Sequence, residues 1–228
     1  MEVTRLSSTL SRGEQKERTR RALLDAALRL SSQAGFGSVS LRQLTKEVGV
    51  VPTAFYRHFG SVDDLGLELV HESVESLRAI LREVRQDAPP PSEVITRSVD
   101  TLFEHVLAHR DHFAFLVRER ASGPAPVRDA IQHQLELFER ELAIDLARIP
   151  APQWSSEDFQ VLANLFVGVM VNNVTALVNL HAGDPAEQAV RERTEIQSRM
   201  IVVGALQWRS DYGAPADSAA RVRKGSHR

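Results

Sequence analysis

The 228-residue sequence has no cysteine, and aromatic residues make up only 6% of it. The absence of cysteine excludes disulfide bonds and thiolate chemistry. No apolar run approaches the ~20 residues that a bilayer-spanning helix needs, and the N-terminal segment lacks the apolar core of a signal peptide. Strand-like alternation and internal repeats are also missing. These absences predict a soluble, cytoplasmic, all-α protein with no membrane partner.

Charge is nearly balanced, at −2 overall, but its distribution along the chain is uneven. Residues 1–60 contain ten Lys and Arg against five Asp and Glu, whereas the remainder contains 18 against 25. A basic N-terminal module on an acidic body is typical of a protein that presents one end to phosphate. The hydrophobic content of 43% is ordinary for a globular chain and sufficient for one large core or two small ones.

The segment 36–60 has the pattern of two short helices joined by a turn. Ser40 stands before an apolar stripe that begins at Leu41, where a hydroxyl can cap a helix. Gly49 supplies the turn, and Pro52 suits the start of a second helix because its missing N–H costs nothing there. This pattern predicts a helix-turn-helix, whose second helix enters the major groove of double-stranded DNA.

Apolar periodicity and helix-breaking Pro and Gly residues divide the chain into nine predicted helices. They are expected at residues 14–34, 41–48, 53–59, 61–86, 92–109, 111–122, 127–148, 156–181 and 185–210. Three would form a DNA-binding head, one a bridge and five a bundle. We therefore expect a DNA-binding domain at 14–60 and a ligand-binding and dimerisation domain at 61–210. A disordered arm at 1–13 and a disordered tail at 211–228 would flank them.

Residues 18–69 resemble the DNA-binding region of TetR-family transcriptional repressors. The match includes an amphipathic first helix and then Gly-Phe, Ser-Leu-Arg, Gly-Val, Pro and Phe-Tyr-Arg-His-Phe, all in register. The resemblance implies a TetR-like fold, with a three-helix head and a larger helical domain for ligand binding and dimerisation. Two positions depart from the pattern: Val51, where many members have a capping Ser, and Val62, where many have a Lys. The helix N-termini near Ser40 and Ser61 can bind phosphate without a basic side chain.

The resemblance also implies which residues contact the operator. Tyr56 and His58 match positions that hold the phosphate backbone, and Thr53 and Arg57 can reach phosphate or base edges. The full set of expected DNA-binding residues is Lys16, Arg20, Ser40, Arg42, Lys46, Thr53, Ala54, Tyr56, Arg57 and His58. The basic run that contains Lys16 and Arg20 fits equally a phosphate-contacting first helix and a solvated face with i, i+4 ion pairs.

The segment 113–123, Phe-Ala-Phe-Leu-Val-Arg-Glu-Arg-Ala-Ser-Gly, resembles one TetR subgroup. This subgroup contains the FabR and DesT repressors of unsaturated fatty-acid synthesis and desaturation. Residues 62–67, Val-Asp-Asp-Leu-Gly-Leu, agree with the same subgroup, in which the Lys is absent as it is at Val62. Ala54 departs from the Ser expected in FabR, which points to a different operator preference. The resemblance implies regulation of fatty-acid metabolism by a long-chain acyl-CoA effector, with no cofactor.

An acyl chain would lie among apolar residues of the helical bundle. The expected ligand-binding residues are Phe103, Leu107, Phe115, Leu116, Arg118, Arg120, Phe138, Phe166, Met170 and Asn173. Arg118 and Arg120 fit either contact with an anionic head group or ion pairs between helices. Asn173 interrupts an apolar helix face, so it needs a partner across a dimer interface, on a neighbouring helix or in a ligand.

The last two predicted helices carry apolar residues on more than one face, including Val167, Val171, Ile201, Val202 and Val203. Such a distribution is typical of helices that bury surface on two sides. We expect the two helices to pair with those of a second copy. The resulting homodimer would read a palindromic operator.

Three histidines, His105, His109 and His112, have a spacing that allows a metal site. Because a new helix is expected to begin near Asp111, we predict no metal. No nucleophile with a base and an orienting group is visible, so we expect no catalytic residues and no enzyme activity. Three alternatives stay open. They are a TetR-type repressor of efflux or catabolic genes with another hydrophobic effector, a helical enzyme acting on acyl thioesters, and a DNA-architectural protein without a ligand.

Overall fold

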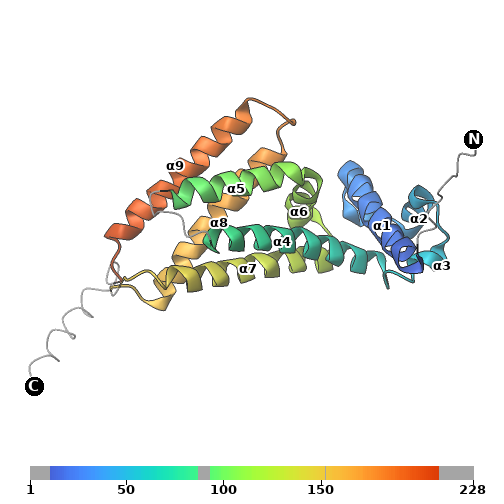
Figure 1. Ribbon diagram of the computed structural model, residues 1–228, viewed down its shortest axis with the longest axis horizontal. Coiled ribbons are helices and arrows are strands. Elements are labelled where there is room, and N and C mark those ends of the chain that lie inside the picture. Colours follow the sequence, from blue (N-terminus) through green and yellow to red (C-terminus); the bar gives the residue numbers. More distant parts are fainter. Residues whose placement is uncertain (1–10, 87–92, 152, 211–228) are drawn as a thin grey trace, which may run out of the picture. The chain divides into compact units, whose positions relative to one another are not determined.

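The computed structural model describes residues 11–86, 93–151 and 153–210. Within these ranges the chain forms nine α-helices and one short 3₁₀ helix, without a strand (Figure 1). The predicted all-α fold is therefore confirmed. The chain divides into two compact units. The head unit contains the described residues up to Arg82 together with His105–Gln132, and the body unit contains Glu83–Glu104 and the described residues from His133 onward.

This division differs from the predicted domain boundary at residue 60. The helices α4 (Val62–Gln86), α5 (Val94–Ala108) and α7 (Ala125–Leu146) each pass from one unit to the other, and α6 (Arg110–Ser122) belongs to the head unit. The expected boundary follows a change of sequence pattern, whereas the compact units follow packing. The predicted tail at 211–228, the predicted cap Ser92 and all but the last three residues of the predicted arm lie outside the described residues.

The first helix, α1 (Arg12–Ala34), begins two residues earlier than predicted. The reason is a capping box. The hydroxyl of Ser11 accepts a hydrogen bond from the N–H of Glu14, whose carboxylate accepts one from the N–H of Ser11. This pair satisfies two N–H groups that lack helical partners. The helix ends as predicted at Gly35, where a φ of 81° favours a residue without a Cβ.

The first helix of the predicted helix-turn-helix is α2 (Leu41–Val48), which follows the 3₁₀ turn η1 (Phe36–Ser38). Ser40 caps α2 as predicted: its hydroxyl accepts from the N–H of Gln43, whose side chain accepts from the N–H of Ser40. Gly49 ends the helix in the left-handed conformation, at a φ of 73°. The turn therefore has the chemistry that the sequence indicates.

The second helix of the motif, α3 (Pro52–Phe55), is shorter than the predicted 53–59. Val51 precedes it and provides no side-chain cap, so the N-terminus lacks one stabilising hydrogen bond. Beyond Phe55 the chain continues in turns, in which the N–H groups of His58 and Phe59 donate to the carbonyl of Phe55 at 2.8 and 3.1 Å. The motif thus ends in one helical turn extended by tight turns.

The core of the head unit consists of large apolar side chains that are almost completely buried. They are Leu23, Leu24, Phe36, Leu44, Phe55, Phe59, Leu65, Leu69 and Val70. Burial of one such side chain contributes about 1.5–3 kcal/mol relative to exposure. Phe55 and Phe59 pack with their ring centroids 5.7 Å apart, as expected for anchors of a small head. This packing turns the polar side of α3 outward.

Two helix starts in the head unit show how local caps decide boundaries. Ser61 caps α4, because its hydroxyl accepts the N–H of Asp64 at 3.0 Å. In the helix α6, His109 occupies the cap position, and the predicted cap Asp111 lies inside the first turn. A carboxylate in the first turn stabilises the positive end of the helix dipole, so Asp111 acts there without capping.

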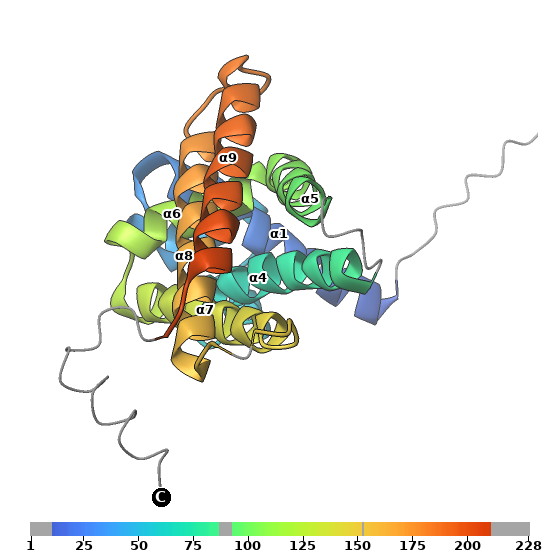
Figure 2. The ribbon, with the colours of Figure 1, turned by 90° about the vertical axis from the view of Figure 1, so that its left-hand side faces the viewer.

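The body unit contains α8 (Ser156–Val178) and α9 (Ala186–Gln207), which lie side by side (Figure 2). Ser155 and Asp158 form a capping box at the start of α8. Both helices end about three residues before the predicted positions. Along α9 the buried positions Val190, Thr194 and Ser198 recur every fourth residue, which gives this helix a narrow inward stripe.

One described helix, α8, is long and apolar enough to cross a membrane by length and composition. This differs from the expectation that no segment approaches such a length. One third of its most apolar window, 33%, is buried within the protein. Core helices of soluble proteins have the same composition, so the property is weak evidence for a membrane segment.

Candidate functional site

The outer side of the recognition segment is polar and accessible. Thr53, Tyr56 and Arg57 are exposed, with Tyr56 59% exposed, while the neighbouring Phe55 is fully buried. The Tyr56 ring stands edge to face on Phe55, with centroids 5.6 Å apart, so its position is fixed by the core. The segment therefore presents a hydroxyl, a phenol and a guanidinium in a defined arrangement.

The preceding helix adds positive charge to the same unit. Arg42 and Lys46 on α2 are exposed, whereas Ala54 on α3 is half-buried. Ser40 is exposed, but its hydroxyl is used in the capping box of α2. Its predicted contact with phosphate thus depends on the helix N-terminus rather than on a free hydroxyl.

His58 is less accessible than expected for a phosphate contact. It is half-buried, and within the described residues its Nδ1 atom is buried without a hydrogen-bond partner. Burial lowers the pKa of His58, and the nearby positive charges of Lys16, Arg20 and Arg57 lower it further. The imidazole is accordingly neutral near pH 7. A neutral ring binds phosphate by donating one N–H and adds no net charge.

Arg20 differs most clearly from the sequence expectation. Its guanidinium is ion-paired with Glu68 and Glu72 on α4, at 3.0 Å for Glu72, and lies 5.7 Å from the ring centroid of Phe59. These partners favour the ion-pair interpretation of the basic run at this residue, and a DNA contact of Arg20 stays an untested prediction. Lys16 is exposed, and its contact with DNA stays a prediction.

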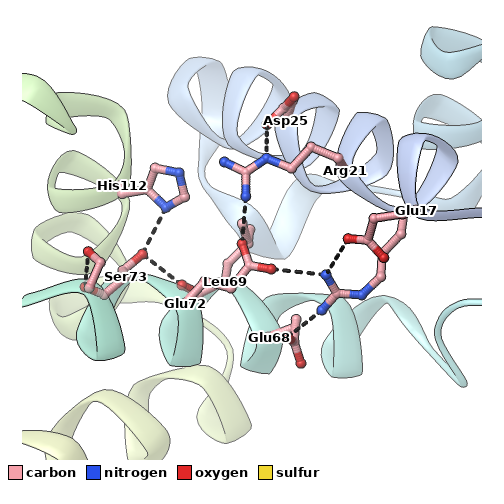
Figure 3. A network of polar contacts seen from close by, with 10 residues as sticks. Glu17, Arg21, Asp25, Glu68, Leu69, Glu72, Ser73 and His112 are labelled. Carbon is pink, nitrogen blue, oxygen red and sulfur yellow. Dashed lines mark hydrogen bonds and ion pairs between the residues drawn. The ribbon is translucent and has the colours of Figure 1, made fainter. Parts of the chain in front are cut away.

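Arg20 belongs to a larger network in which carboxylates of α4 face basic side chains of α1 (Figure 3). Arg21 contacts Glu72 at 3.0 Å and Asp25 at 3.3 Å. These partners are not predicted by the sequence pattern, although Glu68 and Glu72 have the i, i+4 spacing of a charged helix face. The basic run of α1 is therefore divided between exposed residues and ion pairs with α4.

The three histidines make polar and ring contacts within the head unit. Ser73 and Ser76 on α4 lie 2.9 and 2.8 Å from His112 Nδ1 and His105 Nε2 respectively. The rings of His105 and His109 lie 4.3 Å apart between centroids. Among the residues that the structure describes, no three His, Cys, Asp or Glu side chains converge on a possible metal position. His105 and His112 instead link α4 to the end of α5 and to α6.

The predicted ligand-binding residues divide between the two units. Leu107, Phe115, Leu116, Arg118 and Arg120 belong to the head unit, and Phe103, Phe138, Phe166, Met170 and Asn173 belong to the body unit. Their common pocket stays a prediction. Phe115 packs edge to face on Phe36, and Arg118 donates to the carbonyl of Ser31, so both have partners in the head.

Within the body unit, polar side chains connect neighbouring helices. Asn173 is 3% exposed, and its amide donates to Gln197 on α9 at 2.7 Å and to the carbonyl of Val169 at 2.8 Å. A partner for Asn173 was expected across a dimer interface, on a neighbouring helix or in a ligand, and the structure shows one on the neighbouring helix α9. Arg191 is ion-paired with Asp100 and lies 5.2 Å from the ring centroid of Phe103. Phe103 is thus buried beneath a cation, and its contact with a ligand stays a prediction.

Each of the helices α8 and α9 exposes an apolar stripe. On α8, Val161 and Leu165 are 55% and 50% exposed; on α9, Ile196, Met200 and Val203 are 54%, 69% and 63% exposed. The spacing within each helix places these residues on one face. A row of exposed apolar side chains on one helix face is a candidate surface for contact with a partner.

Comparison with known proteins agrees with the geometry of the head. Residues 23–69 match the family described as bacterial regulatory proteins of the tetR family, and residues 91–204 match the tetracyclin repressor-like C-terminal domain. A TetR-family transcriptional regulator from Streptomyces coelicolor has a similar fold, with a TM-score of 0.64 and 20% identity. That match covers 82% of this chain and 96% of the other.

Two further solved structures share the fold. A TetR-like transcriptional regulator from Rhodococcus sp. RHA1 has a TM-score of 0.62 and 20% identity, over 86% of this chain and 100% of that one. The fatty acid degradation regulator FadR from Bacillus halodurans has a TM-score of 0.59 and 15% identity, over 78% and 94%. The two family matches describe transcriptional regulators, which excludes the enzyme alternative. Because the C-terminal match alone spans half of the chain, and the N-terminal match contains the helix-turn-helix, the protein belongs to the TetR family of transcriptional regulators.

Proposed function

We propose that this protein is a cytoplasmic, homodimeric repressor that binds a palindromic operator and responds to a long-chain acyl-CoA, thereby regulating fatty-acid metabolism. The observation that carries DNA binding is the exposed set of Thr53, Tyr56 and Arg57 above the buried anchor Phe55. When the recognition helix lies in the major groove, exposed side chains of this kind can contact base edges and phosphates. Arg42 and Lys46 add phosphate contacts from the helix that crosses the backbone.

The contacts divide into two classes. Tyr56 and His58 add a hydroxyl and one neutral-ring N–H, which suit phosphate oxygens and carry no sequence information. Arg57 and Thr53 have the donors that read base edges, where loss of a contact costs about 1–3 kcal/mol of discrimination. Variants at the first pair should therefore weaken binding to all duplexes, and variants at the second pair should reduce preference for the operator.

A second copy of this chain is the proposed partner of the exposed stripes on α8 and α9. Two copies related by a two-fold axis would bury Leu165 and Met200 in a four-helix interface. The same symmetry would place two heads on two half-sites of a palindrome. Gly168 lies on the same face of α8 as Leu165 and is surrounded by open space within the chain, so a second copy has room to reach the helix backbone there.

Dimer formation can be tested with two matched charge substitutions. Leu165→Glu places a charge in the proposed interface, whereas Ile144→Glu places one at an exposed apolar site on α7, where Ile144 is 64% exposed. Sedimentation at micromolar concentration should give a dimer for the wild type and Ile144→Glu and a monomer for Leu165→Glu. A wild-type monomer would contradict both the dimer and the symmetric operator.

The support for an acyl-CoA effector is the sequence resemblance of residues 113–123 to fatty-acid regulators. The fold shared with a fatty acid degradation regulator is compatible with it. Phe138, Phe166 and Met170 in the body unit are half-buried and apolar, as a site for an acyl chain requires. Each buried CH₂ contributes about 0.8 kcal/mol, so a long chain supplies micromolar affinity even after ordering costs.

The effector is tested by fluorescence anisotropy on an operator selected from randomised duplexes. Palmitoyl-CoA and oleoyl-CoA should change operator affinity, while CoA without an acyl chain should not. Phe166→Trp should narrow the tolerated chain length because it fills the same space. If neither acyl-CoA changes operator affinity and neither produces heat in calorimetry, the lipid proposal fails. Titration with other hydrophobic compounds then tests the efflux or catabolic alternative.

A further inference from the structure

The helix α6 contacts the junction between α1 and the helix-turn-helix through three of its residues, all within the head unit. Arg118 donates to the carbonyl of Ser31, in the last turn of α1. Glu119 accepts a hydrogen bond from the N–H of Phe36, at 3.0 Å. Phe115 packs edge to face on the ring of Phe36, with centroids 5.6 Å apart and an interplanar angle of 90°.

The Glu119 contact is buried and closely fitted. Its side chain is only 1% exposed, and a carboxylate is costly to bury unless it accepts hydrogen bonds. Gly123 makes room for it, because a Cβ there would lie 2.6 Å from the Glu119 carbonyl oxygen and 2.8 Å from Oε2. A surface carboxylate needs no such accommodation. The hydrogen bond from the Phe36 N–H to Glu119 is therefore a specific feature of this junction rather than an incidental contact.

The two backbone groups that α6 holds lie just before the DNA-binding helices. The Phe36 N–H opens η1, the Phe36 carbonyl accepts from the N–H of Val39 at 2.9 Å, and α2 begins at Leu41. Fixing Phe36 thus fixes the start of α2. The Ser31 carbonyl, which also accepts from the N–H of Gly35 at 2.8 Å, fixes the end of α1 in the same way.

We propose that Arg118 and Glu119 are positioning residues for DNA recognition, through which α6 sets the orientation of the DNA-binding helices. This inference rests on operator binding by the head. The contact is separate from the ion pairs of α4 with α1, so α6 has its own connection to the recognition segment. Any displacement of α6 by an effector would move Ser31 and Phe36 directly. In the sequence Arg-Glu-Arg at 118–120, the first two residues then have a structural role, as the donor to the Ser31 carbonyl and the acceptor of the Phe36 N–H.

The test compares two substitutions at position 119. Glu119→Leu has a similar volume but no acceptor for the Phe36 N–H, whereas Glu119→Gln keeps an acceptor oxygen. In anisotropy titrations of the full-length protein, Glu119→Leu should bind the selected operator about tenfold more weakly or worse, and Glu119→Gln within about threefold of wild type. Affinity for an unrelated duplex should change less than twofold in both. Asp111→Asn, which removes an exposed carboxylate from the same helix, should leave both affinities unchanged.

Position 118 provides an independent arm. Arg118→Ala should weaken operator binding several-fold, and Arg118→Lys should restore most of it because one donor is sufficient for the Ser31 carbonyl. The Phe36 amide resonance in ¹⁵N-phenylalanine-labelled protein should shift upfield in Glu119→Leu and stay near its original position in Glu119→Gln. Circular dichroism must show that each variant is folded at the assay temperature.

Unchanged operator affinity in folded Glu119→Leu and Arg118→Ala would overturn the proposal. It would also be overturned if these variants lost affinity equally for the operator and for the unrelated duplex. If Glu119→Leu does not fold, unchanged affinity of Arg118→Ala alone overturns it. Wild-type protein and Tyr56→Phe serve as references on the same duplexes. If the wild type shows no operator preference, it is operator recognition itself that fails, and the two failures are thereby distinguished.

Discussion

Gly66 on α4 is a position at which a single added methyl group should have a measurable steric effect. A Cβ at this residue would lie 2.5 and 2.7 Å from two ring atoms of Phe36 and 2.9 Å from a methyl group of Val127. Gly66→Ala would therefore force apart α4, the start of the helix-turn-helix and the start of α7. The Phe36 ring is fully buried and packed against Phe115, so it has little room to move.

Two opposing contributions determine the size of the effect. Replacing a helical glycine with alanine favours the folded state by about 0.5–1 kcal/mol. Overpacking a close-fitted core costs about 1–3 kcal/mol, and three contacts below 3 Å place Gly66 toward the upper end. We expect a net loss of about 1–2 kcal/mol in the free energy of unfolding. With a urea m-value of about 3 kcal/mol/M, the midpoint should fall by about 0.5 M.

The assay is equilibrium urea unfolding at fixed protein concentration, followed by circular dichroism. Gly13→Ala is the matched control, because this glycine also lies in a helix and its Cβ would approach nothing closer than 3.9 Å. Only the helix-propensity contribution applies there, so the free energy of unfolding of Gly13→Ala should stay unchanged or rise by up to about 1 kcal/mol. If Gly66→Ala is as stable as the wild type or more stable, the close approach of Phe36 and Val127 to α4 is wrong.

Three further predictions concern the polar contacts. Burial, followed by neighbouring charged or histidine side chains, lowers the pKa values of His105 and His112. The folded state therefore disfavours their protonated forms. The free energy of unfolding should be constant above about pH 6.5 and fall below that value, and the urea midpoint of the double variant His105→Gln/His112→Gln should depend less on pH than that of the wild type. A double-mutant cycle on Arg20→Ala and Glu72→Ala should give a coupling energy of about 1 kcal/mol, and additive losses would show that the ion pair contributes nothing. Asn173→Ala should lower the unfolding free energy by about 1–3 kcal/mol, because Gln197 loses its buried donor; a loss below 0.5 kcal/mol would contradict this.

Local signals allowed much of the fold to be predicted from the sequence. Ser40, Gly49 and Pro52 determine a cap, a turn and a helix start through their own backbone preferences, and all three have the predicted places. The start of α1 was missed because its cap depends on the reciprocal bonds of Ser11 and Glu14. The length of the recognition helix was overestimated, since turns with similar hydrogen bonds continue the apolar pattern to Phe59.

Long-range partners could not be predicted, because they depend on which helix faces meet. Arg20 and Arg118 have the same charge and similar local surroundings in the sequence. In the structure one is bound by carboxylates of α4 and the other by the carbonyl of Ser31. Glu119 lies between two arginines in the sequence but is the most buried acid of the described helices. The exposed residues of α2 and α3 could be identified because the buried anchors Phe55 and Phe59 determine which side faces outward.

The most direct test of DNA recognition by the α2–α3 segment is operator binding as a function of salt. Anisotropy titrations from 50 to 200 mM salt should show a preference for the selected operator over a scrambled duplex. Affinity should fall with a log–log slope of about −0.9 per phosphate contacted. Tyr56→Phe should weaken binding to both duplexes equally, and Arg57→Ala should reduce the preference. A salt-independent affinity, or wild-type binding by both variants, would contradict the assignment of this segment.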